Sequence, residues 1–298
     1  MMEPSSAKVA FIGIGTMGWP MASRLVGHVA ELAVFDIAQG RVAQFAAEVG
    51  GNAKGSLADA ATNADILITM LPTSTQVADV VESIAGVMPP GSLVVEMSSG
   101  TPAVTIALEG LLSEIGIRLI DCPVSGGSAR APSGELTIMA GGADIDISRA
   151  EPLLRLLGTT IHRCGPVGSG HAMKALNNLV YAGGLLVAIE ALLMGKAAGL
   201  SPSHMLEVMN QSSGMNYSTK SKIAPAVLSR SFESGFKLDL LLKDVRIARG
   251  VGEGHNVEGA VCSAILEVLT EAARSLGPGR DVATVALALE RLSGQSLV

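Results

Sequence analysis

The chain has 298 residues with a formal net charge of −6, and 48% of them are hydrophobic although only 3% are aromatic. This composition excludes a disordered chain, and a length near 300 residues predicts about two domains. A negative chain without a Lys/Arg run has no basic surface for a nucleic-acid backbone, so we expect no nucleic-acid partner. The three cysteines are widely spaced and the five histidines lack ligand spacing, so we expect reduced thiols, a cytoplasmic protein and no metal site.

Short β-rich runs alternate with helical segments in the first half of the chain, which is typical of a parallel sheet with crossover helices. The expected strands, several of them apolar on both faces, are Val9–Ile12, Leu32–Phe35, Ile66–Met70, Leu93–Glu96, Leu119–Asp121, Leu136–Met139 and Thr160–Arg163. Beyond Gly165 the pattern is helical, with expected helices at Ala172–Ala198, Pro202–Met209, Leu238–Gly250 and Asn256–Leu276. The sequence therefore predicts an α/β fold: an N-terminal doubly wound sheet (residues 1–167) joined by a long helix to an all-helical C-terminal domain (residues 168–298).

No segment of the chain predicts export or a membrane span. The start, Met1 to Lys8, is mostly polar, so we expect no signal peptide. The longest apolar stretch, Leu179–Ile189, is shorter than the ~20 residues that a membrane span requires, and Glu190 ends it. We therefore expect a core helix there and no membrane partner.

A glycine-rich turn joins the first expected strand to the helical stretch Trp19–Val26. It consists of Gly13, Ile14, Gly15, Thr16, Met17 and Gly18, which is the GxGxxG motif. Alone this motif is weak evidence, because it also occurs in turns without a ligand. Between a strand and a helix it indicates a Rossmann-type dinucleotide site, because glycines let the backbone approach a pyrophosphate whose charge lies at the helix N-terminus.

Asp36 ends the second expected strand, 18 residues after Gly18. A carboxylate there accepts hydrogen bonds from both ribose hydroxyls of an adenosine and repels a 2′-phosphate, so NAD is favoured over NADP. Two alternatives stay open. Asp36 is a solvated residue that opens a turn, or the nearby Arg41 accommodates NADP.

Three further segments follow expected strands, at the sheet edge where doubly wound folds bind their ligands. Met70–Thr73 and Glu96–Ser99 are expected to line the cofactor cleft, although each also reads as an ordinary loop. Asp121–Gly127 offers a hydroxyl and the N–H groups of a glycine turn, and such a nest suits an anionic carboxylate. The alternative is a tight turn between the sheet and a loop.

Lys174 is the candidate for proton transfer. It lies about one turn inside the long expected helix, after the glycine-rich Gly165–Gly170, and Asn178 shares its face four residues later. Oxidation of a carbinol needs a group that removes the hydroxyl proton. We expect the helix N-terminus, partial burial and a bound cofactor to lower the pKa of the lysine toward neutrality. The alternative is a lysine that snorkels from an apolar helix.

Two neighbouring features have simpler interpretations. Lys243 and Asp244 form a charged pair within an apolar helix, for which a local ion pair is the default explanation. His171 precedes Lys174 by three residues and is interpreted as a helix-start residue rather than a catalyst.

Together these segments resemble the β-hydroxyacid dehydrogenase family, which includes 3-hydroxyisobutyrate dehydrogenase and tartronate semialdehyde reductase. The resemblance covers nearly the whole chain, through Phe11–Gly18 with Pro20–Ala22, Met70–Pro72, Asp121–Gly127, Gly165–Asn178 and Lys243–Asp244. Cys122 stands where the family more often has Ala, and Met97–Pro102 differs slightly from the usual Ser-Thr form. Ser212–Ser218 should approach the distal end of the substrate, but it matches neither named activity.

The resemblance also implies a role for each site residue. Lys174 is the catalytic lysine, and Lys243 reaches the cofactor and substrate. The substrate's carboxylate and hydroxyl are held by Ser125, Gly126, Gly127 and Asn178. Beyond the glycine turn and Asp36, the residues implied near NAD are Leu71, Pro72, Gln76, Ser99, Lys243 and Asp244. Family members are homodimers or homotetramers with a 6-phosphogluconate dehydrogenase-like, interlocking helical domain.

The sequence therefore predicts an NAD-dependent enzyme that reversibly oxidises a short β-hydroxyacid, a small carboxylate, to its semialdehyde. 3-Hydroxyisobutyrate is the first candidate substrate. Tartronate semialdehyde, threonate, serine and sulfolactaldehyde are alternatives within the family. An imine reductase shares the architecture but replaces the lysine, and a non-catalytic nucleotide-binding scaffold has no need of Lys174, Asn178 and Lys243 together.

Overall fold

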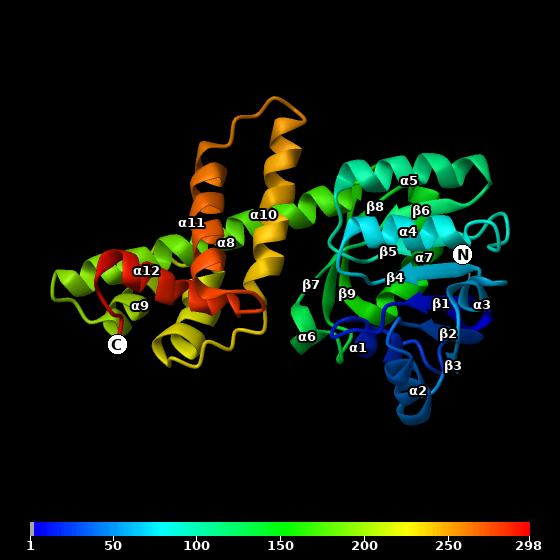
Figure 1. Cartoon of the computed structure of the whole chain (residues 1–298), viewed down its shortest axis with the longest axis horizontal. Helices are drawn as coiled ribbons and strands as arrows, with labels where there is room; N and C mark the ends of the chain where they lie inside the picture. Colours follow the sequence, from blue (N-terminus) through cyan, green and yellow to red (C-terminus); the bar gives the residue numbers. More distant parts are fainter. Residues whose placement is uncertain (1–2) are drawn as a thin grey trace. The chain divides into compact units, whose positions relative to one another are not determined.

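The computed structural model describes residues 3–298, which form two compact units that divide after Lys174 (Figure 1). The first unit contains every strand of the described chain, and the second is helical. The long helix α8, Ser169–Ala197, begins in the first unit and continues into the second.

The strands of the first unit form one sheet in the order β3-β2-β1-β4-β5-β6-β8-β7, and β9 pairs with β8. Their bounds are β1 Lys8–Ile12, β2 Glu31–Phe35, β3 Asn52–Ala53, β4 Ile66–Thr69, β5 Leu93–Glu96, β6 Arg118–Asp121, β7 Val124–Ser125, β8 Leu136–Gly141 and β9 Gly158–Gly165. The first six strands are parallel, and the winding reverses between β1 and β4. This is the strand order of a Rossmann-type sheet, so the predicted fold class is confirmed.

The sheet separates two apolar cores. Val9 and Phe11 of β1 enter one core, whereas Ala10 and Ile12 enter the other, because successive side chains of a strand point to opposite faces. Helices α1, α2 and α7 cover the first core, and α3, α4 and α5 cover the second. Figure 1 shows α4 and α5 along one side of the sheet and α2 on the other. Burial on both faces explains why these strands read as continuous apolar runs.

The helices of the first unit connect successive strands of the sheet. Their bounds are α1 Gly18–Ser23, α2 Gln39–Glu48, α3 Leu57–Ala61, α4 Ser74–Ile84, α5 Pro102–Glu114, α6 Gly127–Arg130 and α7 Asp144–Leu157, with a 3-10 helix, η1, at Pro4–Ser6. Helix α1 ends three residues before the expected end at Val26, where the chain continues in turns.

The end of the sheet is antiparallel, unlike the parallel arrangement that the alternating pattern predicts. Strand β8 runs antiparallel to β6 and β7, while β9 is parallel to β8. The chain returns from β7 to β8 through α6, a helix of four residues. A parallel pair needs a crossover of a dozen or more residues, so this short connection can only reverse the direction of the chain.

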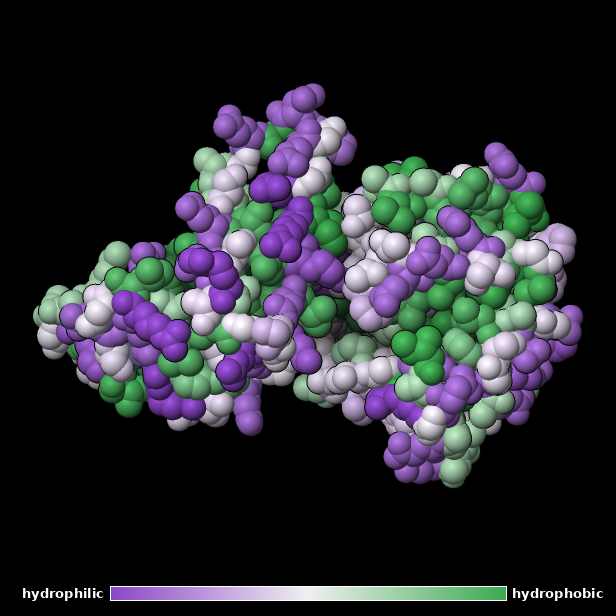
Figure 2. Space-filling view, viewed as in Figure 1, coloured by the Kyte–Doolittle hydropathy of each residue, from purple (hydrophilic) through white to green (hydrophobic). Residues whose placement is uncertain are grey.

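The second unit encloses its own core. Besides α8 it contains α9 Pro202–Asn210, a π-helix η2 at Thr219–Leu228, α10 Leu238–Glu253, α11 Ala260–Leu276, a 3-10 helix η3 at Val282–Thr284, and α12 Val285–Ser293. Ile189 of α8, Leu241 of α10 and Leu269 of α11 are fully buried in this core. The loop that joins α10 to α11 is covered mostly by hydrophilic side chains (Figure 2).

Helix α8 has 29 residues and is, among the described helices, the one long and apolar enough to cross a membrane by length and composition alone. From Ala182 on, its buried apolar residues lie within the core of the second unit, among them Leu185, Leu192 and Leu193. This packing is that of the core helix which the sequence predicts, and it accounts for the apolar character of the helix.

Candidate active site

The glycine-rich turn lies between β1 and α1, as the motif predicts. Gly13 has φ +94°, and a Cβ there would overlap the Met70 carbonyl oxygen at the end of β4. A Cβ on Gly18 would overlap the Gly13 carbonyl oxygen. Both positions therefore require glycine, the first for its backbone conformation and the second for close approach of α1 to the turn.

Gly15 differs from these two glycines, because a Cβ added to it would meet no atom within 4 Å. Gly15 and Thr16 are exposed, so their backbone N–H groups are open to a ligand at the start of α1. Two packed glycines and one open glycine fit a bound pyrophosphate, since the open one leaves the ligand room to reach the backbone. The turn thus fits the dinucleotide that the motif predicts.

Asp36 is tied to the glycine turn. Its Oδ2 accepts a hydrogen bond from the Ile14 N–H at 3.0 Å, and its Oδ1 accepts one from the Ala38 N–H at 2.9 Å. The Nε–H of Arg41 donates to the Ile14 carbonyl oxygen, and its guanidinium lies 5.1 Å from the centre of the Trp19 ring. The carboxylate stands at the end of β2, where a ribose is bound in this kind of sheet.

The loops after β4 and β5 are joined to each other. The Leu71 N–H donates to Ser98 Oγ at 2.9 Å, and the Thr101 N–H donates to Ser74 Oγ at 2.6 Å. Gln76 lies in the first turn of α4, where its N–H donates to the capping Thr73 hydroxyl at 3.3 Å. Ser98 is buried within the segment Glu96–Ser99, and its hydroxyl connects the two segments that are expected to line the cofactor cleft.

Ser125, Gly126 and Gly127 form the predicted nest-like turn between β7 and α6. Gly126 has φ +128° and Gly127 φ +65°, so both adopt conformations that L side chains rarely reach. Both glycines are exposed, and Ser125 is half-buried. The turn is therefore open to a small anionic ligand.

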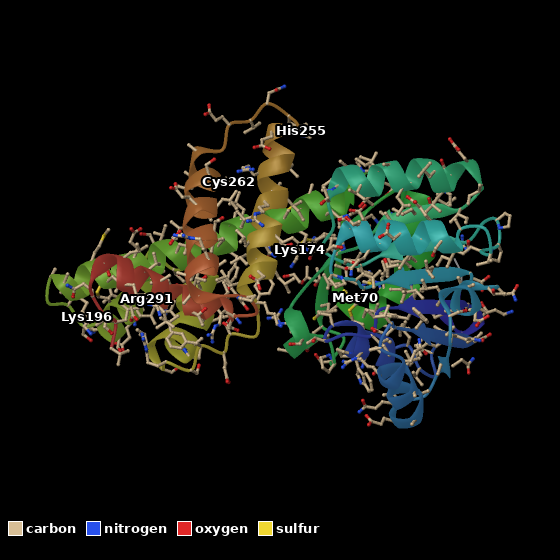
Figure 3. The ribbon with its side chains drawn as sticks, viewed as in Figure 1. Met70, Lys174, Lys196, His255, Cys262 and Arg291 are labelled. Atoms are coloured by element: carbon tan, nitrogen blue, oxygen red, sulfur yellow. The ribbon has the colours of Figure 1, made fainter. Side chains whose placement is uncertain are left out.

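The first turn of α8 is anchored by the carboxylate of Asp121, at the end of β6. Asp121 Oδ1 accepts a hydrogen bond from the Gly168 N–H at 2.7 Å, and Oδ2 accepts one from the His171 N–H at 2.8 Å. Lys174 lies one turn further along this helix and is half-buried; Figure 3 labels it together with Met70. The sequence predicted that Lys174 lies on this helix, but it did not predict that Asp121 holds the first turn of the helix.

Two other buried ionisable side chains adjoin Asp121. Glu96, at the end of β5, lies with its Oε2 2.5 Å from His171 Nε2, and Asp121 Oδ2 lies 3.8 Å from His171 Nδ1. Burial by itself would lower the pKa of His171, but the Glu96 and Asp121 carboxylates raise it above its ordinary value. Burial raises the pKa of Asp121. This effect is larger than the decrease in the pKa caused by the His171 ring and by the N–H groups of Gly168 and His171.

The predicted site residues of the second unit also lie together. Asn178 is buried and donates from Nδ2 to Asp244 Oδ2 at 2.6 Å, while its Oδ1 accepts from Asn177 Nδ2 at 3.2 Å. Lys243 Nζ lies 3.6 Å from Asp244 Oδ1. The local ion pair expected of Lys243 and Asp244 is thus present, and Asp244 also fixes the direction of the Asn178 amide. Their contacts with substrate and cofactor stay predictions.

Two family descriptions match the chain over nearly its whole length. The family described as the NAD binding domain of 6-phosphogluconate dehydrogenase matches residues 8–165. The family described as the NAD-binding domain of NADP-dependent 3-hydroxyisobutyrate dehydrogenase matches residues 168–289. The first match covers the sheet, and the second covers the helical part.

Individual proteins give the same result. The chain is 34% identical over 296 residues to 2-(hydroxymethyl)glutarate dehydrogenase of Eubacterium barkeri, covering 98% of both chains. It is 36% identical over 253 residues to NAD-dependent L-serine dehydrogenase of Pseudomonas aeruginosa, covering 81% of this chain and 84% of that one. Among solved structures, 3-hydroxyisobutyrate dehydrogenase of Mycobacterium tuberculosis with L-serine has a TM-score of 0.88 at 27% identity, covering 95% and 99% of the two chains.

The Rossmann-type sheet, its glycine turn and these matches define an NAD-dependent dehydrogenase that acts on the hydroxyl group of a hydroxyacid. More narrowly, the chain belongs to the β-hydroxyacid dehydrogenase family. The family that the sequence motifs resemble is thereby confirmed, as is NAD as the class of cofactor.

The glycine turn gives a paired prediction. Gly15→Ala should weaken NAD binding about tenfold or more at an unchanged melting temperature, because its Cβ meets no protein atom but enters the space of the ligand. Gly18→Ala should lower the melting temperature by about 5 °C, since overpacking costs about 1–3 kcal/mol. NAD titration and thermal unfolding of both variants measure this, and equal melting temperatures would contradict the assignment.

The buried histidine predicts how stability depends on pH. Since the pKa of His171 is raised in the folded protein, its bound proton stabilises the fold fully below about pH 6.5, and this contribution is lost as the pH rises through the folded-state value. The unfolding free energy, from urea titrations between pH 6 and 9, should therefore fall with rising pH. His171→Gln should flatten this slope, whereas the exposed His162→Gln should retain it. A flat wild-type curve would refute the assignment.

Proposed function

We propose that this chain catalyses the reversible, NAD-linked oxidation of a short β-hydroxyacid to its semialdehyde, with Lys174 as the group that accepts the hydroxyl proton. The observation that carries the proposal is the position of Lys174. It lies one turn into a helix whose start is tied to Asp121, at the carboxyl end of β6. The glycine turn follows β1, so both features belong to the same edge of the parallel sheet.

The chemistry divides between the cofactor and the protein. NAD, when bound, accepts the hydride from the carbinol carbon. Lys174 takes the hydroxyl proton at Nζ in the oxidation and returns it in the reduction, which requires that the amine be uncharged when the hydroxyl arrives. The half-buried position of Lys174 near the N-terminus of α8 favours the uncharged amine.

The substrate is a small carboxylate. The turn formed by Ser125, Gly126 and Gly127 offers a hydroxyl and backbone N–H groups to its carboxylate. The relatives act, by their names, on 2-(hydroxymethyl)glutarate, L-serine and 3-hydroxyisobutyrate, all of which carry a hydroxyl on the carbon β to a carboxylate. These three compounds form the first substrate panel. Glycerate, threonate and the alcohol form of sulfolactaldehyde follow, glycerate being the alcohol form of tartronate semialdehyde.

Asp36 supports NAD over NADP. Its carboxylate has two hydrogen bonds from backbone N–H groups and lies beside the glycine turn, where a 2′-phosphate would be repelled. Arg41 is a nearby cation that would favour NADP, but its guanidinium is engaged by the Ile14 carbonyl and the Trp19 ring. The rates of substrate oxidation with NAD and with NADP test the preference for NAD.

Lys174→Ala should reduce the rate of NADH formation by about 10²- to 10⁴-fold with an unchanged Kd for NAD, since general acid–base catalysis contributes about that factor. The assay uses the substrate panel at mildly alkaline pH with NAD and with NADP. The exposed Lys220→Ala is the control and should keep the wild-type rate. NAD binding without turnover of any panel member in the wild type would favour a non-catalytic scaffold, and an active Lys174→Ala would remove the lysine from the mechanism.

The apolar stripe along α8 supports a homodimer or homotetramer. Val180, Val187 and Met194 are spaced by seven residues and are 76%, 65% and 65% exposed. Such spacing places apolar side chains on one face of a helix, as at an interface between helices. We therefore propose that a second copy of this chain covers the stripe.

Val187→Glu should shift the protein toward the monomer in sedimentation experiments at micromolar concentration, because it places a charge in the proposed interface. Ile145→Glu is the matched control, since Ile145 is 78% exposed and belongs to α7 rather than to the stripe on α8. A monomeric wild type, or the same sedimentation coefficient for wild type and both variants, would reject the interface.

A further inference from the structure

Glu96, Asp121 and His171 form a buried ionic cluster in the first unit, which the reaction as described above does not use. They are 2%, 0% and 1% exposed and come from the ends of β5 and β6 and from the first turn of α8. His171 contacts both acids, Glu96 through Nε2 and Asp121 through Nδ1, so the cluster consists of ion pairs. Buried charges persist only when paired, which makes their arrangement informative.

Each carboxylate of the cluster uses both of its oxygens. Glu96 accepts the Ser98 N–H on Oε1 at 3.0 Å and faces His171 Nε2 with Oε2. Asp121 accepts the N–H groups of Gly168 and His171, one on each oxygen. Asp121 therefore holds the backbone at the start of α8, and Glu96 holds the imidazole ring of His171. An anchor of this kind fixes both the position of the helix start and its rotation about the helix axis.

The contacts of the ring indicate a doubly protonated imidazole. At 2.5 Å, Nε2 and the Glu96 oxygen need a proton between them, although the oxygen lies off the ideal N–H direction. Nδ1 lies 2.9 Å from Thr105 Oγ1, and the Thr105 hydroxyl donates to the Thr101 carbonyl, so its oxygen accepts from Nδ1–H. Asp121, 3.8 Å from Nδ1, favours the same proton.

Three glycines let the backbone pack closely around the cluster. A Cβ on Gly100 would lie 2.6 Å from His171 Cε1, and one on Gly141 would lie 2.5 Å from Asp121 Oδ1. A Cβ on Gly170 would overlap the Met139 carbonyl oxygen. The backbone therefore packs directly against the ring and the Asp121 carboxylate, and a side chain at Gly100 or Gly141 would displace them.

Lys174 follows His171 by three residues on the same helix, so the two side chains are neighbours on the helix surface. We propose that Glu96, Asp121 and His171 are positioning residues, which clamp the first turn of α8 to the ends of β5 and β6 and so fix the place and electrostatic surroundings of the Lys174 amine. The inference rests on the proposed role of Lys174, but it concerns a property of the cofactor-free protein.

Other groups that face the cluster belong to the same argument. The Ser98 backbone contributes to the raised pKa of His171, and the Cys122 thiol lies within electrostatic range of both acids and the Cys164 thiol within range of Asp121. Burial raises the pKa of both thiols, with Asp121 adding to the effect, so they stay neutral near pH 7. Loss of the imidazolium therefore leaves the surroundings of Lys174 more negative, which stabilises the charged lysine.

The test measures the Lys174 amine directly in the cofactor-free protein. The rate at which an amine-reactive acylating reagent modifies Lys174 is followed by mass spectrometry of the Lys174 peptide between pH 6 and 10. In His171→Gln, whose amide still donates to Glu96 but carries no charge, the pH midpoint of modification should move upward. His162→Gln, an exposed histidine of β9, should leave the midpoint unchanged.

A second readout separates positioning from a general loss of structure. In His171→Gln, kcat should fall about tenfold to a hundredfold, as a small displacement of a catalytic group allows. The Kd for NAD should stay at the wild-type value. Unchanged kcat and an unchanged modification midpoint would overturn the proposal. Glu96→Gln breaks the same ion pair but removes the acid charge, so if His171→Gln does not fold, the fall in kcat at an unchanged Kd for NAD in Glu96→Gln decides the question.

These outcomes also separate the inference from the proposed function. If Lys174→Ala remains active while the modification midpoint of Lys174 still moves in His171→Gln, the proposed function fails and the clamp stands. If Lys174→Ala is inactive while neither the midpoint nor kcat changes in His171→Gln, the proposed function stands and the clamp fails.

Discussion

The rest of the site depends on two carboxylates buried at the ends of neighbouring strands. Glu96 ends β5 and Asp121 ends β6, and both receive hydrogen bonds from backbone N–H groups that no strand satisfies. Burying a carboxylate is costly unless such donors and a counter-charge are present, and His171 supplies the counter-charge. The helix that carries Lys174 therefore begins where the sheet provides these acids. Its first turn belongs to the first unit for this reason, although most of α8 lies in the second.

The cofactor side of the same sheet edge follows from ordinary backbone constraints. Gly13 and Gly18 let β1 turn directly into α1, and Asp36 at the end of β2 binds the turn through the Ile14 N–H. Ser98 connects this side to the cluster, because its hydroxyl accepts the Leu71 N–H while its own N–H donates to Glu96. Two hydrogen bonds and the Glu96–His171 ion pair thus link the loop after β4 to the start of α8. Rigid support of this kind is what a hydride-transfer site needs, since small displacements are costly in rate.

Features that depend on neighbours in the sequence were predictable. The glycine turn, the alternation of strands and helices, and the long helix follow from local patterns, and the parallel strands agree with the expected segments. Long-range features were not predictable. His171 was interpreted as a helix-start residue, which is correct, but its partner Glu96 lies 75 positions earlier and no spacing rule joins them. The one sequence feature that could have indicated the cluster is the acidic residue at the end of each of two buried strands.

Helix α11 begins at Ala260 rather than at the expected Asn256. Asn256 has a φ of +56°, which is outside the helical region.

The most direct measurement is a crystal structure of the protein with NAD and a slowly turned-over β-hydroxyacid. Lys174 Nζ should lie within hydrogen-bonding distance, about 2.6–3.2 Å, of the substrate hydroxyl. The substrate carboxylate should lie at the turn formed by Ser125, Gly126 and Gly127. A substrate hydroxyl bound by another side chain, with Lys174 directed away from it, would contradict the central role of the lysine.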